Sequence, residues 1–441
     1  MSVTNAAIVI LGASGDLARR KLVPALARLW QRGEIRPPLV VMGSGRTEFT
    51  DESFRSRFEV PAEFAACMHY HQGLTGLRTA LGQHGQFQRV IVFAALPPST
   101  YGDTARQLAA EGFAEDTSLI IEKPFGYDHD SAVRLNRELA ASFDESRIYR
   151  IDHYLAKEAV QNILVFRFAN SLFYPVWNNR YVSSIQINAC EDIGVGERGA
   201  YFDKAGIIRD MVQNHLTQLL CLLTMEAPVS LDAEDIRTQK LSVLKTMRVA
   251  AVSRGQYEGY RRERNVAPDS TTETYAELTL AIDTFRWSGT PIHIRVGKAL
   301  NRKGTEIGFT FRELPRLLFN RDGDLPPNRI VFKIQPAEGI VLDLSTKTPG
   351  GEMRVTGTTM TFCYRDAFKD EIPEAYQRLL LDALKGDRTL FVSADETESS
   401  WKAYEPFLDK GELRTYAPGT LPPPVLHKEW IDFEAYGSVC A

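Results

Sequence analysis

The sequence is poor in the features that mark membrane proteins and nucleic-acid-binding proteins. Its 52 basic and 56 acidic side chains leave a formal net charge of -4, so no basic surplus attracts nucleic acid or an anionic membrane. No apolar run approaches the roughly 20 residues that a bilayer-spanning helix needs. With 44% hydrophobic and 24% charged residues in a chain of 441, the composition is typical of a globular protein of two domains.

Cysteine is also scarce. The five cysteines are odd in number, scattered and without CxxC spacing: Cys67, Cys190, Cys221, Cys363 and Cys440. We therefore expect reduced thiols, a cytoplasmic protein and no cysteine-built metal site. The N-terminus, MSVTNAAIVILGASG, has no basic segment before its short apolar run, which predicts a first β-strand in place of a signal peptide. The GxSxG pattern of serine hydrolases is missing as well.

The first third of the chain alternates between strand patterns and helix patterns. Short apolar runs occupy residues 7–11, 39–42, 90–95 and 119–121, and residues 17–30 carry apolar side chains at helical spacing. Strands that are apolar throughout and separated by helices predict a parallel sheet covered on both faces. This part of the chain is therefore expected to be a Rossmann-like α/β domain.

After about Tyr174 the pattern changes to alternating apolar and polar residues. The alternation is clearest at residues 184–189, 275–282, 292–296 and 329–334. It predicts half-solvated strands of a large, mainly antiparallel sheet, interspersed with helices such as 208–225. We place a boundary near Phe173–Trp177, which gives a dinucleotide-binding domain at 1–174 and an α+β domain at 175–441.

The segment GASGDLARRK follows the first predicted strand and opens the first predicted helix. A dinucleotide fold needs small residues here, so that backbone N–H groups and the helix N-terminus can reach a pyrophosphate. The spacing of Gly12, Gly15 and Ala18 is a variant of the usual fingerprint, and alone it also fits a tight turn without a ligand. The candidate cofactor-binding residues of this loop are Gly12, Ala13, Ser14, Gly15, Asp16 and Leu17.

Arg46 indicates which dinucleotide is bound. It follows the second predicted strand, where an acidic residue would accept hydrogen bonds from a ribose 2′-hydroxyl. An arginine suits a 2′-phosphate instead, which favours NADP over NAD. A solvated surface arginine is the alternative interpretation.

Four further stretches carry a family resemblance: ALPPSTY at 95–101, IEKPFG at 121–126, RIDHYLAKEAVQN at 150–162 and GIIRDMVQNHL at 206–216. In this order, behind GASGDLA, they closely resemble the glucose-6-phosphate dehydrogenase family. The later segments VGKALNRK, KIQP and PEAYQRLLLDAL extend the resemblance over most of the chain. The resemblance implies oxidation of glucose 6-phosphate to 6-phosphogluconolactone with hydride transfer to NADP, at the entry to the oxidative pentose phosphate pathway. It also implies a homodimer or homotetramer.

The RIDHYLAK segment groups side chains that can hold a phosphate. An imidazole, a phenol and an ammonium can cradle a phosphate dianion with charge-assisted hydrogen bonds, and residues four apart would share a face on a helix. A solvated charged turn is the alternative. The resemblance implies that His153, Tyr154 and Lys157 bind the sugar phosphate. It assigns further substrate contacts to Glu191, Asp210, Lys298, Lys303 and Gln335.

Oxidation of a C1 hydroxyl requires a base, because a proton must leave the oxygen as hydride leaves the carbon. A histidine is suited to this near neutral pH. The resemblance implies that His215 is the base, that Asp152 supports it, and that Lys123 contacts substrate near the nicotinamide. Pro124 restricts Lys123 to extended backbone angles. Hydride transfer needs no metal, and no His/Cys cluster has ligand spacing, so we expect none.

Three alternatives stay open. The chain could act on another phosphorylated sugar or prefer NAD; it could be a catalytically silent sugar-phosphate sensor; or it could bind a nucleotide without a substrate. The joint presence of Asp152, His215 and Lys123 argues against the sensor. The segment YAPGTLPPPVLHKEW replaces a Gly-Trp-Gly-Pro type of C-terminal segment in many family members, so the terminal packing is expected to differ. Gly304 and Gly308 stand where some members carry basic residues for a second, structural NADP, which we do not expect here.

Overall fold

The computed structural model describes residues 2–315, 318–319, 325–368 and 373–440, and the chain forms two compact units. Unit 1 consists of Met1–Lys157, Pro228–Leu241 and Ile372–Lys402, and unit 2 of Glu158–Ala227, Ser242–Glu371 and Ala403–Ala441. This division differs from the single boundary expected near Phe173–Trp177. Local patterning cannot show that two later segments return to the first sheet, because their partners lie far away in the sequence.

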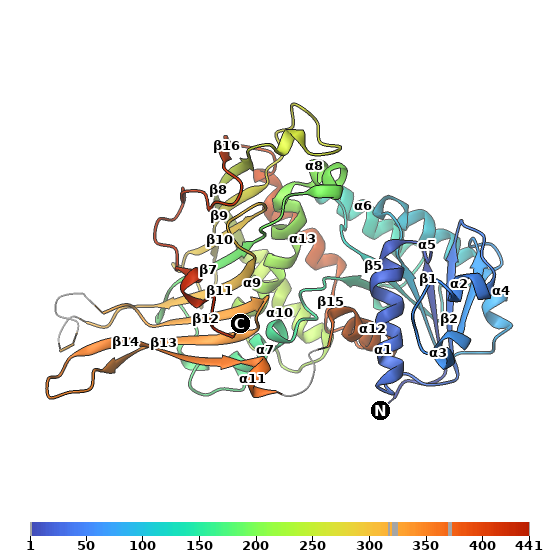
Figure 1. The fold of residues 1–441 in the computed structure, drawn as a ribbon, viewed down its shortest axis with the longest axis horizontal. Coiled ribbons are helices and arrows are strands. Elements are labelled where there is room, and N and C mark those ends of the chain that lie inside the picture. The colour runs from blue at the N-terminus through green and yellow to red at the C-terminus, as the bar shows by residue number, and fades with distance from the viewer. Residues whose placement is uncertain (1, 316–317, 320–324, 369–372, 441) are drawn as a thin grey trace. The chain divides into compact units, whose positions relative to one another are not determined.

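A seven-stranded sheet forms the centre of unit 1 (Figure 1). Its order is β15-β6-β5-β4-β1-β2-β3, and β1 to β6 run parallel, as the apolar runs predict. The strands are β1 (Ala6–Leu11), β2 (Leu39–Gly45), β3 (Met68–Gln72), β4 (Arg89–Ala94), β5 (Thr117–Glu122), β6 (Ile148–Ile151) and the antiparallel β15 (Phe391–Val392). All six residues of β1 are buried, which is typical of a strand covered on both faces.

Helices of unit 1 follow the strands along the chain. They are the π-helix η1 (Ala18–Leu22), α1 (Val23–Gln31), α2 (Asp51–Arg55), α3 (Ala62–Ala66), α4 (Leu77–Gly82), α5 (Tyr101–Ala110), α6 (His129–Ala140) and, from the last segment, α12 (Ala375–Lys385) and most of α13 (Ala394–Tyr404). α6 begins at a capping box, in which the Asp128 carboxylate accepts the backbone N–H of Ser131 at 2.8 Å. The helix expected at 17–30 is thus a π-helix turn followed by an α-helix.

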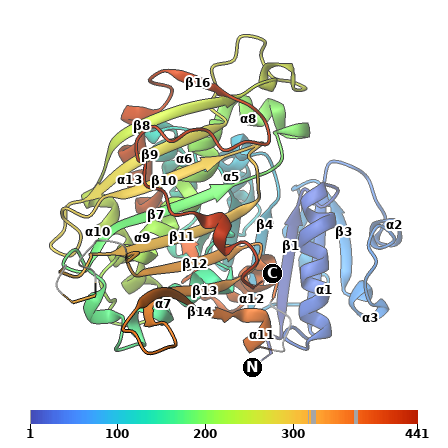
Figure 2. The same ribbon diagram turned by 60° about the vertical axis from the view of Figure 1, so that its left-hand side comes forward.

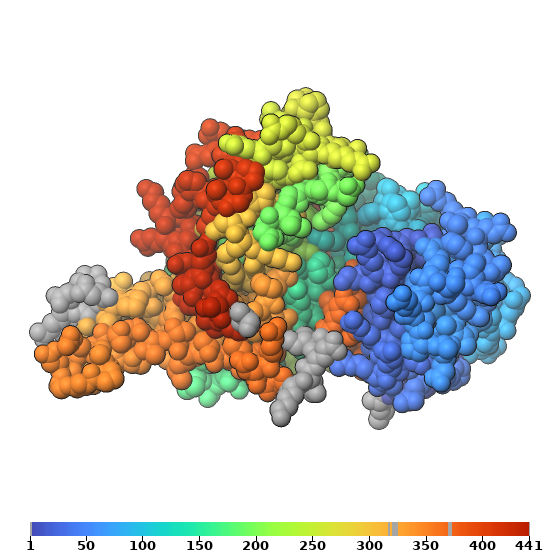
Figure 3. Space-filling view, in the orientation of Figure 1, coloured from blue at the N-terminus to red at the C-terminus, as the bar shows by residue number. Residues whose placement is uncertain are grey.

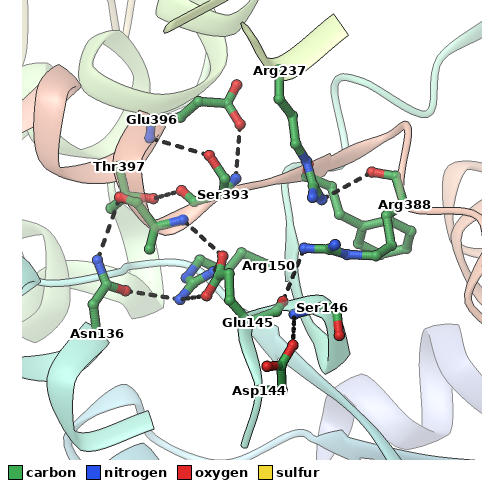
Figure 4. A network of polar contacts seen from close by, with 12 residues as sticks. Asn136, Asp144, Glu145, Ser146, Arg150, Arg237, Arg388, Ser393, Glu396 and Thr397 are labelled. Atoms are coloured by element: carbon green, nitrogen blue, oxygen red, sulfur yellow. Dashed lines mark hydrogen bonds and ion pairs between the residues drawn. The ribbon is translucent and has the colours of Figure 1, made fainter. Parts of the chain in front are cut away.

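Hydrogen bonds of Arg150, Arg237 and Arg388 join the three segments of unit 1 (Figure 4). Arg150 of β6 is fully buried and donates to Glu145 Oε1 at 2.7 Å and to Asn136 Oδ1 at 2.9 Å. Arg388 donates to the backbone carbonyl of Glu145 at 2.9 Å, and Arg237 donates to that of Arg388 at 3.1 Å. Each segment therefore supplies groups that the others need, since buried guanidinium groups are costly without partners.

Unit 2 is built on a nine-stranded sheet of order β14-β13-β12-β11-β7-β10-β9-β8-β16 (Figure 2). Its strands are β7 (Val182–Cys190), β8 (Met247–Tyr257), β9 (Tyr275–Ile282), β10 (Ile292–Gly297), β11 (Gly304–Phe311), β12 (Arg329–Gln335), β13 (Gly339–Lys347), β14 (Val355–Cys363) and β16 (Leu413–Tyr416). Most pairs are antiparallel, which confirms the expected sheet. β7 with β10 and β8 with β16 run parallel, which the local alternation could not show.

The helices of unit 2 include α7 (Glu158–Phe168), α8 (Gly199–Ile207), the π-helix η6 (Ile208–Leu216) and α9 (Thr217–Thr224); α10 (Ala233–Thr246) runs from unit 1 into unit 2. The helix expected at 208–225 is therefore a π-helix continued by an α-helix. Gly206 separates α8 from η6 with φ of 69° and ψ of 172°. In the described part of the chain, no helix is both long and apolar enough to cross a membrane.

The C-terminal segment crosses the surface of the large sheet of unit 2 (Figure 3). Ile431, Phe433 and Tyr436 pack against Val331 and Val341 in a buried cluster. A disulfide joins Cys363 and Cys440, so the expectation of reduced thiols is wrong for this pair. Their separation of 77 residues gave no signal in the sequence. The free cysteines are Cys67, Cys190 and Cys221.

Candidate functional site

Four groups of predicted site residues lie at one edge of the parallel sheet. The GASGDL loop follows β1, Arg46 follows β2, Lys123 follows β5 and Asp152 follows β6. Because these strands are parallel, their carboxyl ends meet at the same edge. Ligands of such sheets bind at this edge, where the strand order reverses between β1 and β4. Unit 1 thus brings together every cofactor-binding residue that the sequence suggested.

The GASGDL loop has the shape that the phosphate-binding interpretation requires. Gly12 has φ of 75°, and a Cβ there would lie 2.3 Å from the carbonyl oxygen of Ala95, so glycine is needed. The backbone N–H groups of Gly12 and Ala13 donate to the Ser44 carbonyl at 2.8 and 3.0 Å, which ties the loop to β2. The chain then turns directly into a helix, whose N-terminus favours an anion.

Two arginines flank this loop. Arg46 directly follows β2 and is exposed. Arg57 is half-buried; its Nη2 donates to the Ser14 carbonyl at 2.9 Å, and its guanidinium lies 4.8 Å from the ring centre of Phe49. Sequence reasoning missed Arg57, because nothing in its surroundings points to a loop 43 residues earlier.

Glu122, the last residue of β5, is a second group that sequence reasoning missed. Its carboxylate accepts the Tyr376 hydroxyl at 2.8 Å, and its backbone exchanges hydrogen bonds with the Tyr101 hydroxyl. Burial raises the pKa of Glu122 to about 7, against the lowering effects of Tyr376 and Lys123. A carboxyl group that titrates near neutrality therefore precedes Lys123, which is joined to Pro124 by a cis peptide.

The RIDHYLAK segment is a turn between β6 and α7, so the helical arrangement considered for His153 and Lys157 is wrong; the helix begins at Glu158. Asp152 is buried, and its Oδ1 accepts the backbone N–H of Tyr154 at 3.0 Å, which fixes the carboxylate. The Lys157 ammonium lies 5.3 Å from the centre of the buried Tyr154 ring, and the His153 ring is also 5.3 Å from it. The turn thus groups the three predicted phosphate ligands compactly.

In unit 2 the predicted substrate residues also collect at one end of a sheet. Glu191 and Lys298 directly follow the neighbouring parallel strands β7 and β10, and their side chains form an ion pair. The Lys298 ammonium is also 3.9 Å from Asp210, whose Oδ1 accepts a bond from Arg198 at 3.2 Å. Lys298 and Asp210 are almost fully buried, so this cluster is strongly organised.

Lys303 and Gln335 lie at the same end of the large sheet. Lys303 immediately precedes β11, whose first residue, Gly304, pairs with the last residue of β7. Gln335 ends β12 opposite Thr305 and is joined to Pro336 by a cis peptide. Their placement agrees with the predicted substrate contacts without assigning them a ligand.

His215 lies on the π-helix η6 and is 1% exposed. In a π-helix each N–H donates to the carbonyl five residues earlier, so His215 and Asp210, five residues apart, lie on nearby faces of η6. The helix is set by Gly206 and Glu273: a carboxylate oxygen of Glu273 accepts the Ile208 N–H at 3.3 Å, and its backbone carbonyl accepts the Ile207 N–H at 3.0 Å. π-helical turns within or next to α-helices are frequent at functional sites.

The side chains suit proton and hydride chemistry on a polar substrate. Carboxylates and lysines can bind hydroxyls and an anion, and a buried imidazole can take up a proton. Among the described residues, no group of three His, Cys, Asp or Glu side chains could hold a metal ion. The loop after β1 and Arg46 fit a nicotinamide dinucleotide, which would supply the hydride acceptor when bound.

Two family models match the chain. Residues 9–162 match "Glucose-6-phosphate dehydrogenase, NAD binding domain", and residues 164–432 match "Glucose-6-phosphate dehydrogenase, C-terminal domain". The chain is 40% identical over 438 residues to the glucose-6-phosphate 1-dehydrogenase of Bacillus subtilis, covering 90% of both proteins. It is 38% identical over 450 residues to glucose-6-phosphate 1-dehydrogenase 5, cytoplasmic, of Arabidopsis thaliana, covering 92% of this chain and 87% of that protein.

A solved structure described as glucose-6-phosphate dehydrogenase in complex with its substrate glucose-6-phosphate resembles the chain with a TM-score of 0.90. It is 35% identical, and the similarity covers 96% of both chains. A 3-ketoreductase from Actinomadura kijaniata in complex with NADP has a TM-score of 0.53 at 12% identity, which shows a shared fold alone.

Proposed function

This chain belongs to the glucose-6-phosphate dehydrogenase family and is an oxidoreductase of glucose 6-phosphate, and we propose that NADP is its hydride acceptor and His215 its base. The observation that carries the base assignment is the arrangement of η6. His215 is buried on η6, five residues after Asp210, which lies 3.9 Å from the Lys298 ammonium. This arrangement supports a base close to charged groups that can bind sugar hydroxyls.

The proposed reaction removes two hydrogens from C1 of the sugar. One ring nitrogen of His215 takes the hydroxyl proton while the C1–H bond breaks, and the oxygen forms a double bond to C1 to give the lactone. The hydride passes to the nicotinamide. The Asp152 carboxylate, already fixed by the Tyr154 N–H, supports the imidazolium that forms. Lys123 contacts the substrate beside the nicotinamide.

Substrate binding is divided among the remaining groups. His153, Tyr154 and Lys157 take the 6-phosphate, because this turn gathers an imidazole, a phenol and an ammonium. The carboxylates of Glu191 and Asp210 accept hydrogen bonds from sugar hydroxyls. Lys298, Lys303 and Gln335 complete the pocket. The buried ion pairs of Lys298 hold that lysine in place before the substrate arrives.

The preference for NADP rests on Arg46. Its exposed guanidinium at the end of β2 replaces the acidic residue that would select a ribose 2′-hydroxyl. The loop Gly12, Ala13, Ser14, Gly15, Asp16 and Leu17 takes the pyrophosphate.

We further propose that the protein works as a homodimer or homotetramer in the cytoplasm, at the entry to the oxidative pentose phosphate pathway. Exposed apolar side chains in unit 2 support self-association: Leu172, Leu314 and Leu318 are 79%, 75% and 76% exposed. Leu172 and Leu314 share a cavity lining with Leu344 of β13.

The test is the formation of reduced nicotinamide, followed by absorbance, with glucose 6-phosphate and NADP. Free glucose, galactose 6-phosphate and NAD run in parallel. A far higher efficiency with glucose 6-phosphate and NADP than with free glucose, galactose 6-phosphate or NAD is the expected result. Equal efficiency with free glucose would remove the phosphate role of the His153–Lys157 turn, and binding without turnover would favour the sensor.

A further inference from the structure

A polar cavity lies at the amino edge of the parallel sheet of unit 1, opposite the edge that carries the GASGDL loop. Its volume is about 370 Å³, and all three segments of unit 1 contribute to its lining. The 3₁₀-helix η3 (Glu145–Arg147), directly before β6, forms one wall, α10 forms a second, and residues 388–395 around β15 complete the lining. This volume is typical of small-molecule sites, and none of the lining residues belongs to the proposed catalytic site.

Two arginines at this cavity share one carboxylate oxygen. Arg237 Nη1 and Arg388 Nη1 donate to the same atom, Oε1 of Glu234, at 2.8 and 3.2 Å. The arginine side chains, labelled in Figure 4, are 5% and 14% exposed, whereas that of Glu234 is 74% exposed. A solvent-exposed carboxylate thus bridges two mostly buried cations.

The other hydrogen bonds of this arginine pair go to neutral acceptors. Arg237 Nη2 donates to the backbone carbonyls of Arg388 and Phe391 at 3.1 and 3.2 Å, and Arg388 Nη2 donates to that of Glu145 at 2.9 Å. Among the described residues, neither arginine has an acceptor for its Nε–H. Burial and the neighbouring Arg237 lower the pKa of Arg388, as expected where two cations are close. The pair therefore has room for further negative charge.

Glu145 does not supply that charge, because its carboxylate is already engaged. It accepts bonds from the Arg150 guanidinium at 2.7 and 3.1 Å and from the Ala394 N–H at 3.0 Å, at the start of α13. Asp395, the remaining carboxylate of the lining, is exposed on the first turn of α13. Hydroxyl groups come from Ser146, Thr238 and Ser393. The cavity thus combines a pair of guanidinium groups with side chains that accept hydrogen bonds.

We propose that this cavity is a binding site for a small phosphorylated polyol or sugar. The phosphoryl group takes the place of the Glu234 carboxylate between Arg237 and Arg388, and that carboxylate turns out into the solvent. A phosphoryl group carries up to two negative charges and three peripheral oxygens, so each guanidinium receives its own acceptor. Hydroxyls of the ligand donate to the Asp395 carboxylate.

A ligand in this cavity stabilises unit 1. The two arginines come from the second and third segments, and the Glu145 carbonyl that Arg388 binds comes from the first. A phosphoryl group that holds both guanidiniums keeps the three segments together. Because the ligand binds the folded chain only, it should raise the urea-unfolding midpoint as its concentration rises.

Isothermal calorimetry with three probes tests which part of the ligand is recognised. Glycerol 3-phosphate carries a phosphoryl group and hydroxyls, inorganic phosphate carries the anion alone, and glycerol carries the hydroxyls alone. Glycerol 3-phosphate should bind roughly three- to tenfold more tightly than inorganic phosphate, the gain from one added hydrogen bond, and glycerol should give no binding heat. Binding of glycerol as tight as that of glycerol 3-phosphate would overturn the proposal.

Two variants of the cavity should change the affinity in opposite directions. Glu234→Gln removes the competing carboxylate and should tighten binding of glycerol 3-phosphate roughly three- to tenfold, whereas Arg388→Gln should weaken it roughly ten- to hundredfold. Glu115→Gln, at an exposed glutamate of unit 1, is the matched control. Unchanged affinity in Glu234→Gln would contradict the proposal. This variant alters an exposed side chain, so the test holds even if Arg388→Gln fails to fold.

The phosphate-binding turn proposed for the substrate is a second place where these probes could bind. Lys157→Ala weakens that turn, so binding to the cavity, with its rise in unfolding midpoint, should persist in Lys157→Ala and vanish in Arg388→Gln. Binding lost in Lys157→Ala but kept in Arg388→Gln would refute the cavity site and support the proposed function. Failure of the proposed function, seen as absent turnover, would leave the calorimetric result for the cavity unaffected.

Discussion

Arg57 donates from Nη2 to the backbone carbonyl oxygen of Ser14 at 2.9 Å, so a side chain from beyond α2 supports the phosphate loop from outside. Arg46, on the same side of the sheet edge, is exposed. Arg57 therefore contacts the loop, and Arg46 is the residue that we propose for the 2′-phosphate. Their roles separate experimentally.

Arg46→Ala should raise the Michaelis constant for NADP by roughly ten- to hundredfold, the effect of losing a charge-assisted hydrogen bond of ~1.5–3 kcal/mol. The constant for NAD should change little. Arg57→Ala is the matched control, and it should weaken both cofactors to a similar extent because it loosens the loop. Steady-state kinetics with the two cofactors measures both effects, and equal losses for Arg46→Ala would remove its role in selecting NADP.

His215→Asn should lower kcat by roughly 10²- to 10⁴-fold, the usual contribution of a general base. Binding of glucose 6-phosphate, followed by isothermal calorimetry, should stay within a few-fold, because the substitution keeps the size and polarity of the side chain. His129→Asn on α6 is the control and should keep its turnover. A His215→Asn enzyme with near-normal kcat would show that another group takes the proton.

Lys157→Ala should reduce kcat/KM for glucose 6-phosphate by roughly ten- to hundredfold, because a cation that pairs with a phosphate is lost. Any oxidation of free glucose at high concentration should be unaffected, since glucose has no phosphate. Lys204→Ala, an exposed lysine of α8, serves as the control. If both substrates lose efficiency equally, Lys157 supports the fold of the turn and does not bind phosphate.

Glu122→Gln should change how stability depends on pH. The pKa of Glu122 is raised from 4.5 to about 7, so the folded protein holds a proton that the unfolded chain releases. Stability from this group is complete below pH 4.5 and declines as the pH rises through 7, by ~3 kcal/mol in all. The glutamine variant cannot ionise and should lose this decline. Urea-unfolding midpoints from pH 4.5 to 8, with exposed Glu115→Gln as the control, measure the difference.

Gly206→Ala should distort the π-helix that carries His215. The residue has φ of 69°, and a Cβ would lie 2.3 Å from a carboxylate oxygen of the buried Glu273. Gly73→Ala is the control, because Gly73 has φ of 78° and open space around it. We expect backbone strain of ~1 kcal/mol or more in both variants and a fall in kcat for Gly206→Ala alone. Equal kcat values would show that η6 tolerates the crowding.

The strands were predictable where their signal is local. The alternation at 275–282 and the apolar run at 7–11 define β9 and most of β1, because burial on one or two faces leaves a mark on each neighbouring residue. The π-helix at 208–216 was not predictable, since its amphipathic pattern also fits an α-helix. The strand β15, two residues long, is too short to leave any pattern.

Site residues, like strands, were predictable where the signal in the sequence is local. Gly12, Lys123 and Asp152 could be proposed from the sequence because each comes directly after a strand or within a distinctive motif. The hydrogen bond of Tyr376 to Glu122 was missed because the two residues are 254 positions apart, and no local feature of α12 indicates that contact. Cys363 and Cys440 were missed for the same reason: contacts between distant segments are set by the fold as a whole.

Unit 1 is assembled from three separate stretches of chain, and this has a consequence for synthesis on the ribosome. Strands β1 to β6 leave the ribosome long before residues 385–402. Until β15 is synthesised, β6 is an unpaired edge of the sheet. The later segments that surround Glu145, the partner of Arg150, are also missing at that stage. The nascent N-terminal half is therefore a natural client for chaperones. A gene cut after residue 157 would encode an unfinished sheet, and the two halves would need to be expressed together to fold.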